Sequence, residues 1–328
     1  METLLTPTAE PVSGHHLRAF NPVSDLNAVA DLVELCFANT LDADGHRYLR
    51  QMRAAARNPN LVRLAGRLGD ASSFPMFGYV WEENGRLIGN LSLVPFRYRG
   101  QRLYMIANVA VHPDFRRRGV ARALTEKSLE HLEQVGAGYP WLQVRDDNPS
   151  AFDLYASLGF QEQFRRTTWH SQHGSPPPLA PPPDYRIIPL AGKDRKLQQR
   201  WLKNAYPTAM EWYLPFRLRD LRPDFLGMVL RLFGGIFVRQ WAAEHANQLV
   251  GTAAWQATQG SYNAVWLGLK PELEENAGHA LLVFLLQKYG LRRAITVDYP
   301  AGRLIESFKN CGFTAQHTLI WMRGTRWK

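Results

Sequence analysis

The order of predicted strands and helices in this chain is the same on both sides of a proline-rich segment. Six prolines fall within the ten residues 174–183. Such a composition excludes helix and central strand and favours an extended, semi-rigid spacer. We therefore predict an N-terminal domain over residues 1–173, a Pro-rich linker over 174–183 and a C-terminal domain over 184–328.

Short landmarks recur at matching places in the two halves. Val111-His112-Pro113 in the first half corresponds to Leu269-Lys270-Pro271 in the second. Likewise, Leu158-Gly159-Phe160 corresponds to Cys311-Gly312-Phe313. Together with the shared order of elements, these landmarks indicate an internal duplication of one fold.

The spacing of apolar residues predicts the elements of the first half. Helices are expected over residues 25–38, with Ser24 as the N-cap, and over 48–56, 122–135 and 150–158. Strands are expected over 17–20, 77–82, 86–96, 103–111, 141–144 and 160–169. A turn at residues 83–85 joins two of these strands into a hairpin.

The second half repeats the pattern. Helices are expected over 193–204, 277–289 and 304–311, and strands over 185–189, 236–244, 249–256, 262–269 and 294–297. This order predicts an α+β (α/β layered) class, with each half a mixed, mostly antiparallel sheet flanked by helices.

Composition excludes several classes of protein. The two cysteines, Cys36 and Cys311, lie far apart without metal-ligand spacing, which argues against disulfides and a metal site. The longest apolar stretch, residues 226–238, is interrupted by Arg231 and too short to span a bilayer, so a cytoplasmic protein without membrane contact is expected. The oligomeric state stays open, a homodimer included.

The net charge of +10 lies almost entirely in the second half. Residues 1–173 hold 19 basic and 18 acidic side chains, whereas residues 174–328 hold 20 and 11. The basic residues are scattered, which favours a solvated face or a partner surface over nucleic-acid binding.

A basic loop between a strand and a helix carries the clearest chemistry. The strand ends at Val111, and Arg116-Arg117-Arg118-Gly119 leads into small residues that begin the next helix. Free amides at a helix N-terminus, backed by arginines, suit a pyrophosphate. Taken alone, the same pattern also fits a solvated basic cap.

Two motifs resemble the GCN5-related N-acetyltransferase (GNAT) superfamily. Arg116, Gly119 and Ala121 occupy the defined positions of its motif A, Gln/Arg-x-x-Gly-x-Gly/Ala. Residues 148–160 resemble its motif B, Asn-x-x-Ala-x-x-Leu-Tyr-x-x-x-Gly-Phe. The resemblance implies an acetyl-CoA-dependent N-acetyltransferase that needs no metal, and it covers roughly residues 15–170.

The resemblance also assigns roles by position. Tyr155 would protonate the departing thiolate of CoA, although a buried core aromatic is the alternative for this residue. Asn108 would position a water. The residues expected to bind CoA are Val109, Ala110, Val111, Arg116, Arg117, Arg118, Gly119, Val120, Ala121, Arg122 and Asn148.

The chain departs from the superfamily where many members carry a glutamate as base. Ala107 and Asn108 stand there, and a neutral amide does not accept a proton as a carboxylate does. The base is left open among Glu82, Asp146, Asp147 and His46. For His112, a turn-capping role is favoured.

The second copy has lost these functional residues. On its landmarks, Glu274, Glu275 and Asn276 stand in place of the three arginines, Phe308 in place of Tyr155 and Ala301 in place of Asn148. We predict a degenerate C-terminal GNAT-like domain that binds no CoA. This domain is expected to pack on the first domain and form a wall of the acceptor site, or to bind a separate partner.

The primary hypothesis is N-acetyl transfer to a small-molecule amine. A non-catalytic CoA-binding, sensing or scaffold protein is the alternative, because the usual carboxylate is missing, and ribosome or nucleic-acid association is a weaker third. The stretches 37–57 and 211–235 are expected to face the acceptor.

Overall fold

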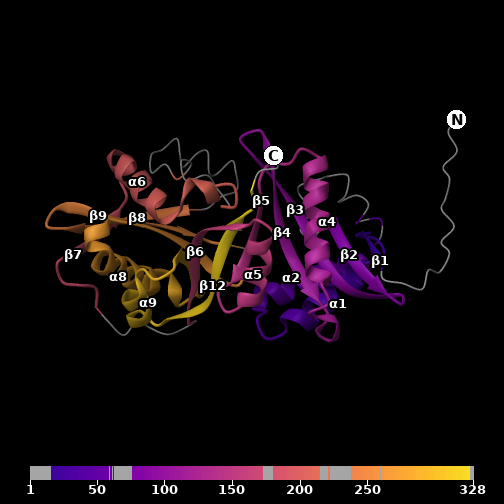
Figure 1. Ribbon diagram of the computed structural model, residues 1–328. Coiled ribbons are helices and arrows are strands. Elements are labelled where there is room, and N and C mark those ends of the chain that lie inside the picture. The colour runs from indigo at the N-terminus through magenta and orange to yellow at the C-terminus, as the bar shows by residue number, and fades with distance from the viewer. Residues whose placement is uncertain are drawn as a thin grey trace. The chain divides into compact units, whose positions relative to one another are not determined.

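The computed structural model describes residues 16–58, 60, 62, 76–172, 180–214, 221, 238–258 and 260–325 (Figure 1). Most of the Pro-rich segment and of the stretch 211–235 lie outside these residues. The helices are α1 (Leu26–Phe37), α2 (Ala43–Ala56), α4 (Val120–Gln134), α5 (Pro149–Ser157), α6 (Arg195–Ala205), α8 (Glu274–Leu285) and α9 (Ile305–Asn310). Short helical turns include η2 (Pro113–Phe115), η6 (Pro271–Leu273) and the π-turn η7 (Leu286–Gly290).

The strands of the first half are β1 (His16–Ala19), β2 (Phe77–Glu83), β3 (Arg86–Tyr98), β4 (Gln101–Val111), β5 (Pro140–Arg145) and β6 (Gln161–Ser171). Those of the second are β7 (Tyr185–Pro189), β8 (Val238–His245), β9 (Gln248–Gln256), β10 (Asn263–Leu269), β11 (Ile295–Pro300) and β12 (Phe313–Arg323). The α+β class predicted from the sequence is confirmed, and most elements begin within a few residues of their predicted positions.

The chain forms two compact units. The first contains residues 1–95, 101–140 and 326–328, and the second residues 96–100 and 141–325. The end of the first sequence copy, with α5 and β6, therefore clusters with the second copy. The domain boundary at 174–183 stays a prediction.

In the first unit, strands β1 to β4 follow one another in the sheet. Asn84 and Gly85, both with positive φ, form the predicted turn between β2 and β3. Val80 lies in the core beneath α1, whereas the adjacent Tyr79 packs on His131 of α4. Because neighbouring residues of a strand point to opposite faces, α1 and α4 cover opposite sides of this sheet.

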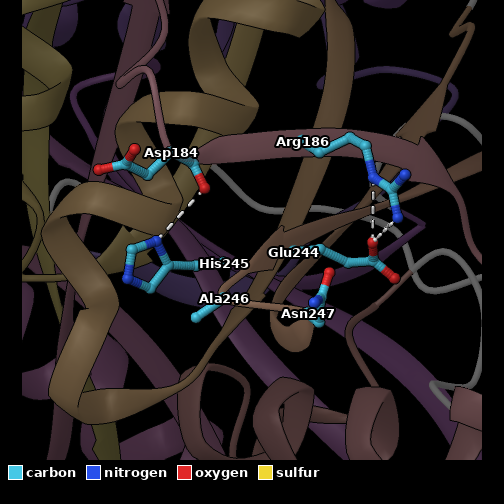
Figure 2. Close-up of a pocket in the computed structure, with 6 residues that line it drawn as sticks. All are labelled: Asp184, Arg186, Glu244, His245, Ala246 and Asn247. Carbon is cyan, nitrogen blue, oxygen red and sulfur yellow. Dashed lines mark hydrogen bonds and ion pairs between the residues drawn. The ribbon is translucent and has the colours of Figure 1, made fainter.

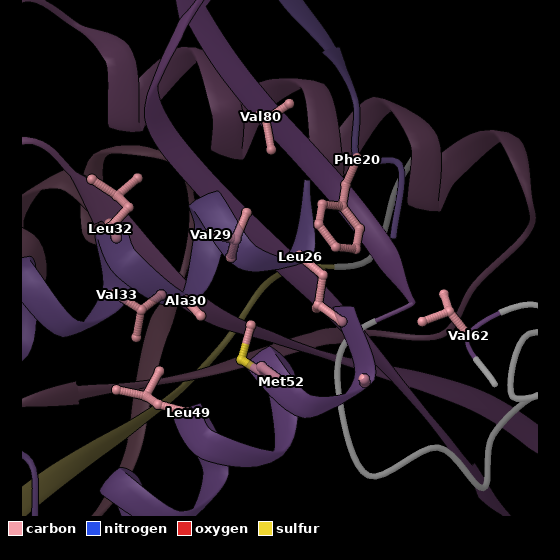
Figure 3. Close-up of a cluster of buried hydrophobic side chains, with 12 residues drawn as sticks. Phe20, Leu26, Val29, Ala30, Leu32, Val33, Leu49, Met52, Val62 and Val80 are labelled. Atoms are coloured by element: carbon pink, nitrogen blue, oxygen red, sulfur yellow. The ribbon is translucent and has the colours of Figure 1, made fainter. Parts of the chain in front are cut away.

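The core under α1 explains why that helix forms. Its apolar residues recur at helical spacing, and Figure 3 shows them gathered with Leu49 and Met52 of α2. The predicted Ser24 cap is wrong, because Asp25 occupies the N-cap and Ser24 donates to its carboxylate. Burial opposes ionisation of Asp25, but hydrogen bonds, chiefly from Arg18, hold its pKa below the ordinary value.

In the second unit, the closing strands of the two sequence copies are exchanged. The strand order is β5-β12-β6-β11-β10-β9-β8-β7. Strand β12, from the end of the chain, pairs antiparallel with β5, while β6 pairs antiparallel with β11. At the β6–β12 seam, Thr167 faces Thr318, and their hydroxyls lie 2.8 Å apart. Each copy therefore completes the sheet of the other.

Candidate active site

Near its end, strand β4 departs from extended geometry at the position where the sequence lacks the expected glutamate, and we call this departure the bulge. Asn108 has a φ of +51°, in the left-handed region that an extended strand does not use. Asn90 Nδ2 donates to the main-chain oxygen of Asn108 at 2.9 Å. A buried side chain of β3 therefore holds the backbone at this left-handed residue.

The basic loop has the geometry of an anion site. After η2, Arg117 and Gly119 take positive φ values of +64° and +80°, and α4 begins at Val120 without a side-chain cap. A Cβ added to Gly119 would meet nothing within 4 Å, so the loop is open there. The first amides of this 15-residue helix have no partner within the helix, and they lie at the positive end of its dipole.

The arginines of the loop are not equivalent. Arg116 Nε donates to the Val111 carbonyl at 3.2 Å, and Cys36 Sγ donates to the same oxygen. Arg118 pairs with Glu83 at 3.1 Å and lies over the Phe115 ring. Arg117 makes no hydrogen bond or ion pair with any residue that the structure describes. Arg116 thus fixes the loop to the strand end, and Arg117 is available to a ligand.

Asn148 and Tyr155 lie on α5 in the second unit. Asn148 is the N-cap of this helix, and its Oδ1 accepts from the Ala151 amide at 3.2 Å. Tyr155 is 6% exposed and packs edge-on against Phe160. Burial raises the pKa of Tyr155 above its ordinary value, so the phenol stays protonated and able to donate.

A polar cluster beside the bulge was not predicted from the sequence. Its members are Tyr48 of α2, Asn90 and Ser92 of β3, and Asn108, and we name it the amide cluster. Asn108 Nδ2 donates to Tyr48 Oη at 3.0 Å and lies 3.4 Å from Ser92 Oγ. Asn90 and Ser92 are 1% and 2% exposed. Two polar residues alternating with leucines in a buried strand are the sequence signal that could have revealed it.

Two of the four candidate bases from the sequence are held in ion pairs with arginines. Arg18 holds Glu82, and Arg145 holds Asp147 and keeps the pKa of that carboxyl low. The His112 side chain accepts from the Asp114 amide, and Arg86 Nη2 lies 2.7 Å from its Nε2. His112 therefore caps the turn, as the sequence predicted.

The second copy lacks the loop altogether, which corrects the alignment on landmarks. Four residues, 116–119, separate η2 from α4, whereas η6 runs directly into α8 at Glu274. Glu274 and Glu275 therefore sit in the first turn of the helix rather than opposite the arginines. The anion loop is deleted rather than substituted.

Carboxylates and apolar side chains fill the corresponding place in the second copy. Glu274 pairs with Arg303 at 2.7 Å, and Glu275 accepts from the amide and hydroxyl of Ser307 at the start of α9. Leu304 packs so closely on Gly278 that an added Cβ would lie 2.4 Å from it. These contacts leave acids where a pyrophosphate would need donors.

Phe308 matches Tyr155 in geometry but not in chemistry. It is fully buried and meets Phe313 at a ring angle of 66°, the same angle at which Tyr155 meets Phe160. In both pairs the partner is five residues further along the chain. The second copy therefore keeps the packing and loses the hydroxyl.

A surface pocket at the edge of the second unit does not resemble an active site. Figure 2 shows it between β7 and the turn joining β8 and β9. Arg186 pairs with Glu244 at 2.6 Å, and His245 Nδ1 lies 3.3 Å from the Asp184 carbonyl oxygen. Arg186 and Glu244 therefore satisfy each other.

Comparisons with known proteins agree with the geometry of the first copy. Residues 36–160 match the Acetyltransferase (GNAT) family. The chain is 44% identical over 63 residues to [Ribosomal protein bS18]-alanine N-acetyltransferase of Escherichia coli K12, covering 19% of this chain and 43% of that protein. It is 34% identical over 88 residues to N-alpha-acetyltransferase 30 of Schizosaccharomyces pombe, covering 26% of this chain and 59% of that one. The chain therefore spans less than two thirds of the length of either relative.

Solved structures share the fold over nearly the whole chain. A GCN5-related N-acetyltransferase from Sphaerobacter thermophilus aligns with a TM-score of 0.56 at 16% identity, covering 95% of this chain and 98% of that one. A tandem GNAT protein from the clavulanic acid biosynthesis pathway aligns with a TM-score of 0.51 at 17% identity, covering 96% and 100%. Within the described ranges, no helix is long and apolar enough to cross a membrane, and no cluster of three or more metal-binding side chains occurs.

Proposed function

We propose that the first copy, whose residues 36–160 match the Acetyltransferase (GNAT) family, transfers an acetyl group from acetyl-CoA to an amine. The observation that carries the proposal is the open loop 116–119 ahead of α4, which the second copy lacks. An acyl-CoA presents a pyrophosphate, which is the group that free helix amides and an unpaired arginine recognise.

In the proposed reaction, the lone pair of a neutral amine attacks the thioester carbon. The C–N bond forms and the C–S bond breaks, with main-chain amides near the β4 bulge stabilising charge on the carbonyl oxygen. Tyr155 donates a proton to the departing sulfur. The nitrogen loses one proton to solvent and solvent returns one to Tyr155, so the overall transfer consumes no base.

The acceptor is proposed to be a small-molecule amine. The curated relatives named above include enzymes that act on the alanine of a ribosomal protein, so a protein N-terminus is the competing acceptor. A matched set of free amines and peptides, incubated with acetyl-CoA while free thiol is monitored, tests the transfer itself. Absence of both CoA binding and thiol release would refute the proposal.

A binding-only role is the second candidate, and Asn108 is the observation that favours it. The amide at this position cannot take a proton from the acceptor. Tight CoA binding without acyl transfer to any amine of the set would support a sensing or scaffold protein instead.

We expect calorimetry of the full chain to give one CoA site rather than two. Arg117→Ala should weaken CoA binding about tenfold or more, since a hydrogen bond to a charged group contributes about 1.5–3 kcal/mol. Arg102→Ala, an exposed arginine at the other end of β4, is the matched control and should leave the affinity unchanged. Two sites per chain would contradict the loss of binding in the second copy.

A further inference from the structure

The amide cluster consists of uncharged side chains that fix the orientation of the Asn108 amide. Asn108 Nδ2 directs its protons toward Tyr48 Oη and Ser92 Oγ, so the orientation of the amide group is set by its neighbours. Among the described residues, none donates to Asn108 Oδ1. This oxygen is left to accept an N–H from a ligand.

The described carboxylates of α1, α2 and β2 all pair with arginines, and Glu83 of β2 does so with Arg118. Arg18 binds both Asp25 beside α1 and Glu82 of β2. On α1, Asp31 and Glu34 pair with Arg53. On α2, Asp44 pairs with Arg47. No hydrogen bond joins any of these acids to the four residues of the cluster.

A neutral cluster and a carboxylate select different amines. A carboxylate stabilises an ammonium ion and can remove its proton, whereas an amide oxygen only accepts a hydrogen bond. The N–H of a neutral amine satisfies Asn108 Oδ1 without leaving a charge in a partly buried site. A strongly basic amine would first have to lose its proton to solvent.

We infer that the acceptor is a weakly basic primary amine that arrives neutral, such as an α-amino group, and that Tyr48 is the residue that positions Asn108 toward it. The inference rests on the proposed function and narrows its substrate class. Tyr48 is a positioning residue, since it acts through the orientation of the amide.

The acceptor's own pKa should then govern the rate. Alanylglycine offers an α-amino group with a pKa of about 7.7–8.0, and Nα-acetyl-lysine an ε-amino group near 10.4. We expect kcat/KM for alanylglycine to rise with pH and level off near pH 8. The ratio of kcat/KM for alanylglycine to that for Nα-acetyl-lysine should fall about 40-fold between pH 8 and 10, because the neutral fraction rises about 70-fold for the lysine derivative and at most about twofold for alanylglycine.

Variants of the cluster provide the second readout. Tyr48→Phe should lower kcat/KM for alanylglycine about fivefold, the usual effect of one lost neutral hydrogen bond, while leaving the affinity for CoA unchanged. Tyr79→Phe, on the opposite face of the same sheet, is the matched control and should be neutral. Asn108→Glu should raise turnover of Nα-acetyl-lysine relative to alanylglycine at pH 7.

The outcomes separate this inference from the proposed function. Transfer that favours Nα-acetyl-lysine at pH 7, or a ratio that stays constant with pH, overturns the inference and leaves acyl transfer standing. CoA binding with no transfer to alanylglycine at any pH also overturns the inference and favours the binding-only role. Absence of CoA binding overturns the proposed function itself.

Discussion

Replacing Tyr155 with phenylalanine is expected to lower kcat by about 100- to 10,000-fold, the usual contribution of a positioned general acid. The affinity for CoA should stay nearly unchanged, because the ring and its packing on Phe160 are retained. Burst and steady-state thiol release, compared with calorimetric CoA binding, measures both quantities. A variant with normal kcat would show that another group protonates the thiolate.

The second copy indicates that this variant will fold. Phe308 already occupies the equivalent position there, buried and in the same edge-on contact with the following phenylalanine. Tyr289→Phe is a suitable control, since its hydroxyl is buried and has no hydrogen-bond partner in the part of the chain that the structure describes. Removing that hydroxyl should leave both stability and kcat unchanged.

The pH dependence gives an independent test of the same residue. Because burial raises the pKa of Tyr155, the phenol loses its proton only above its ordinary pKa of about 10. The acid function is therefore present at neutral pH and is lost only as pH rises past that value. A fall in kcat between pH 7 and 9 that disappears in Tyr155→Phe would contradict this assignment.

The sequence predicted the elements well because their signals are local. Helical spacing of apolar residues placed α1 and α4, and the Asn84-Gly85 turn fixed the hairpin of β2 and β3. The exchange of β6 and β12 has no local signal. Both strands follow a Gly-Phe landmark and carry similar patterns, so either could complete either sheet, and only tertiary packing decides.

Only part of the candidate site could be predicted, because only local signals can be read from the sequence. The motif around Arg116 and Gly119 is contiguous, whereas Tyr48 reaches Asn108 across 60 residues of sequence. The alignment of the second copy failed because the landmarks, 46 residues apart from Pro113 to Gly159 but 41 from Pro271 to Gly312, show that residues are missing and not where they are missing. Glu274, Glu275 and Asn276 consequently matched the three arginines in number but not in position.

Replacing Arg166 with methionine is expected to lower the free energy of unfolding by about 3–5 kcal/mol. Arg166 lies on the exchanged strand β6 and is 2% exposed. Its guanidinium donates to the main-chain oxygens of Ala205 at 2.6 Å and Asp298 at 2.7 Å, and to the carboxylate of Asp298 at 3.0 Å. It also lies over the Tyr206 ring.

Methionine keeps the aliphatic stem but leaves two main-chain oxygens without their donor. Water can rehydrate the partly exposed carboxylate of Asp298, so the loss comes chiefly from the carbonyl groups. The neighbouring Arg165 provides the matched control, because the one described residue with which its exposed side chain forms an ion pair is Glu162. Arg165→Met should change the free energy of unfolding by less than about 0.5 kcal/mol.

Urea unfolding of the two variants compares a buried arginine that bonds to neighbouring elements with an exposed arginine on the same strand. If Arg166 joins β6 to α6 and β11, its replacement must destabilise the unit that contains both exchanged strands. The midpoint should then fall well below that of Arg165→Met. Equal midpoints for the two variants would mean that strand pairing alone stabilises the exchanged arrangement. The hydrogen bonds of the buried guanidinium would then only offset the cost of its desolvation.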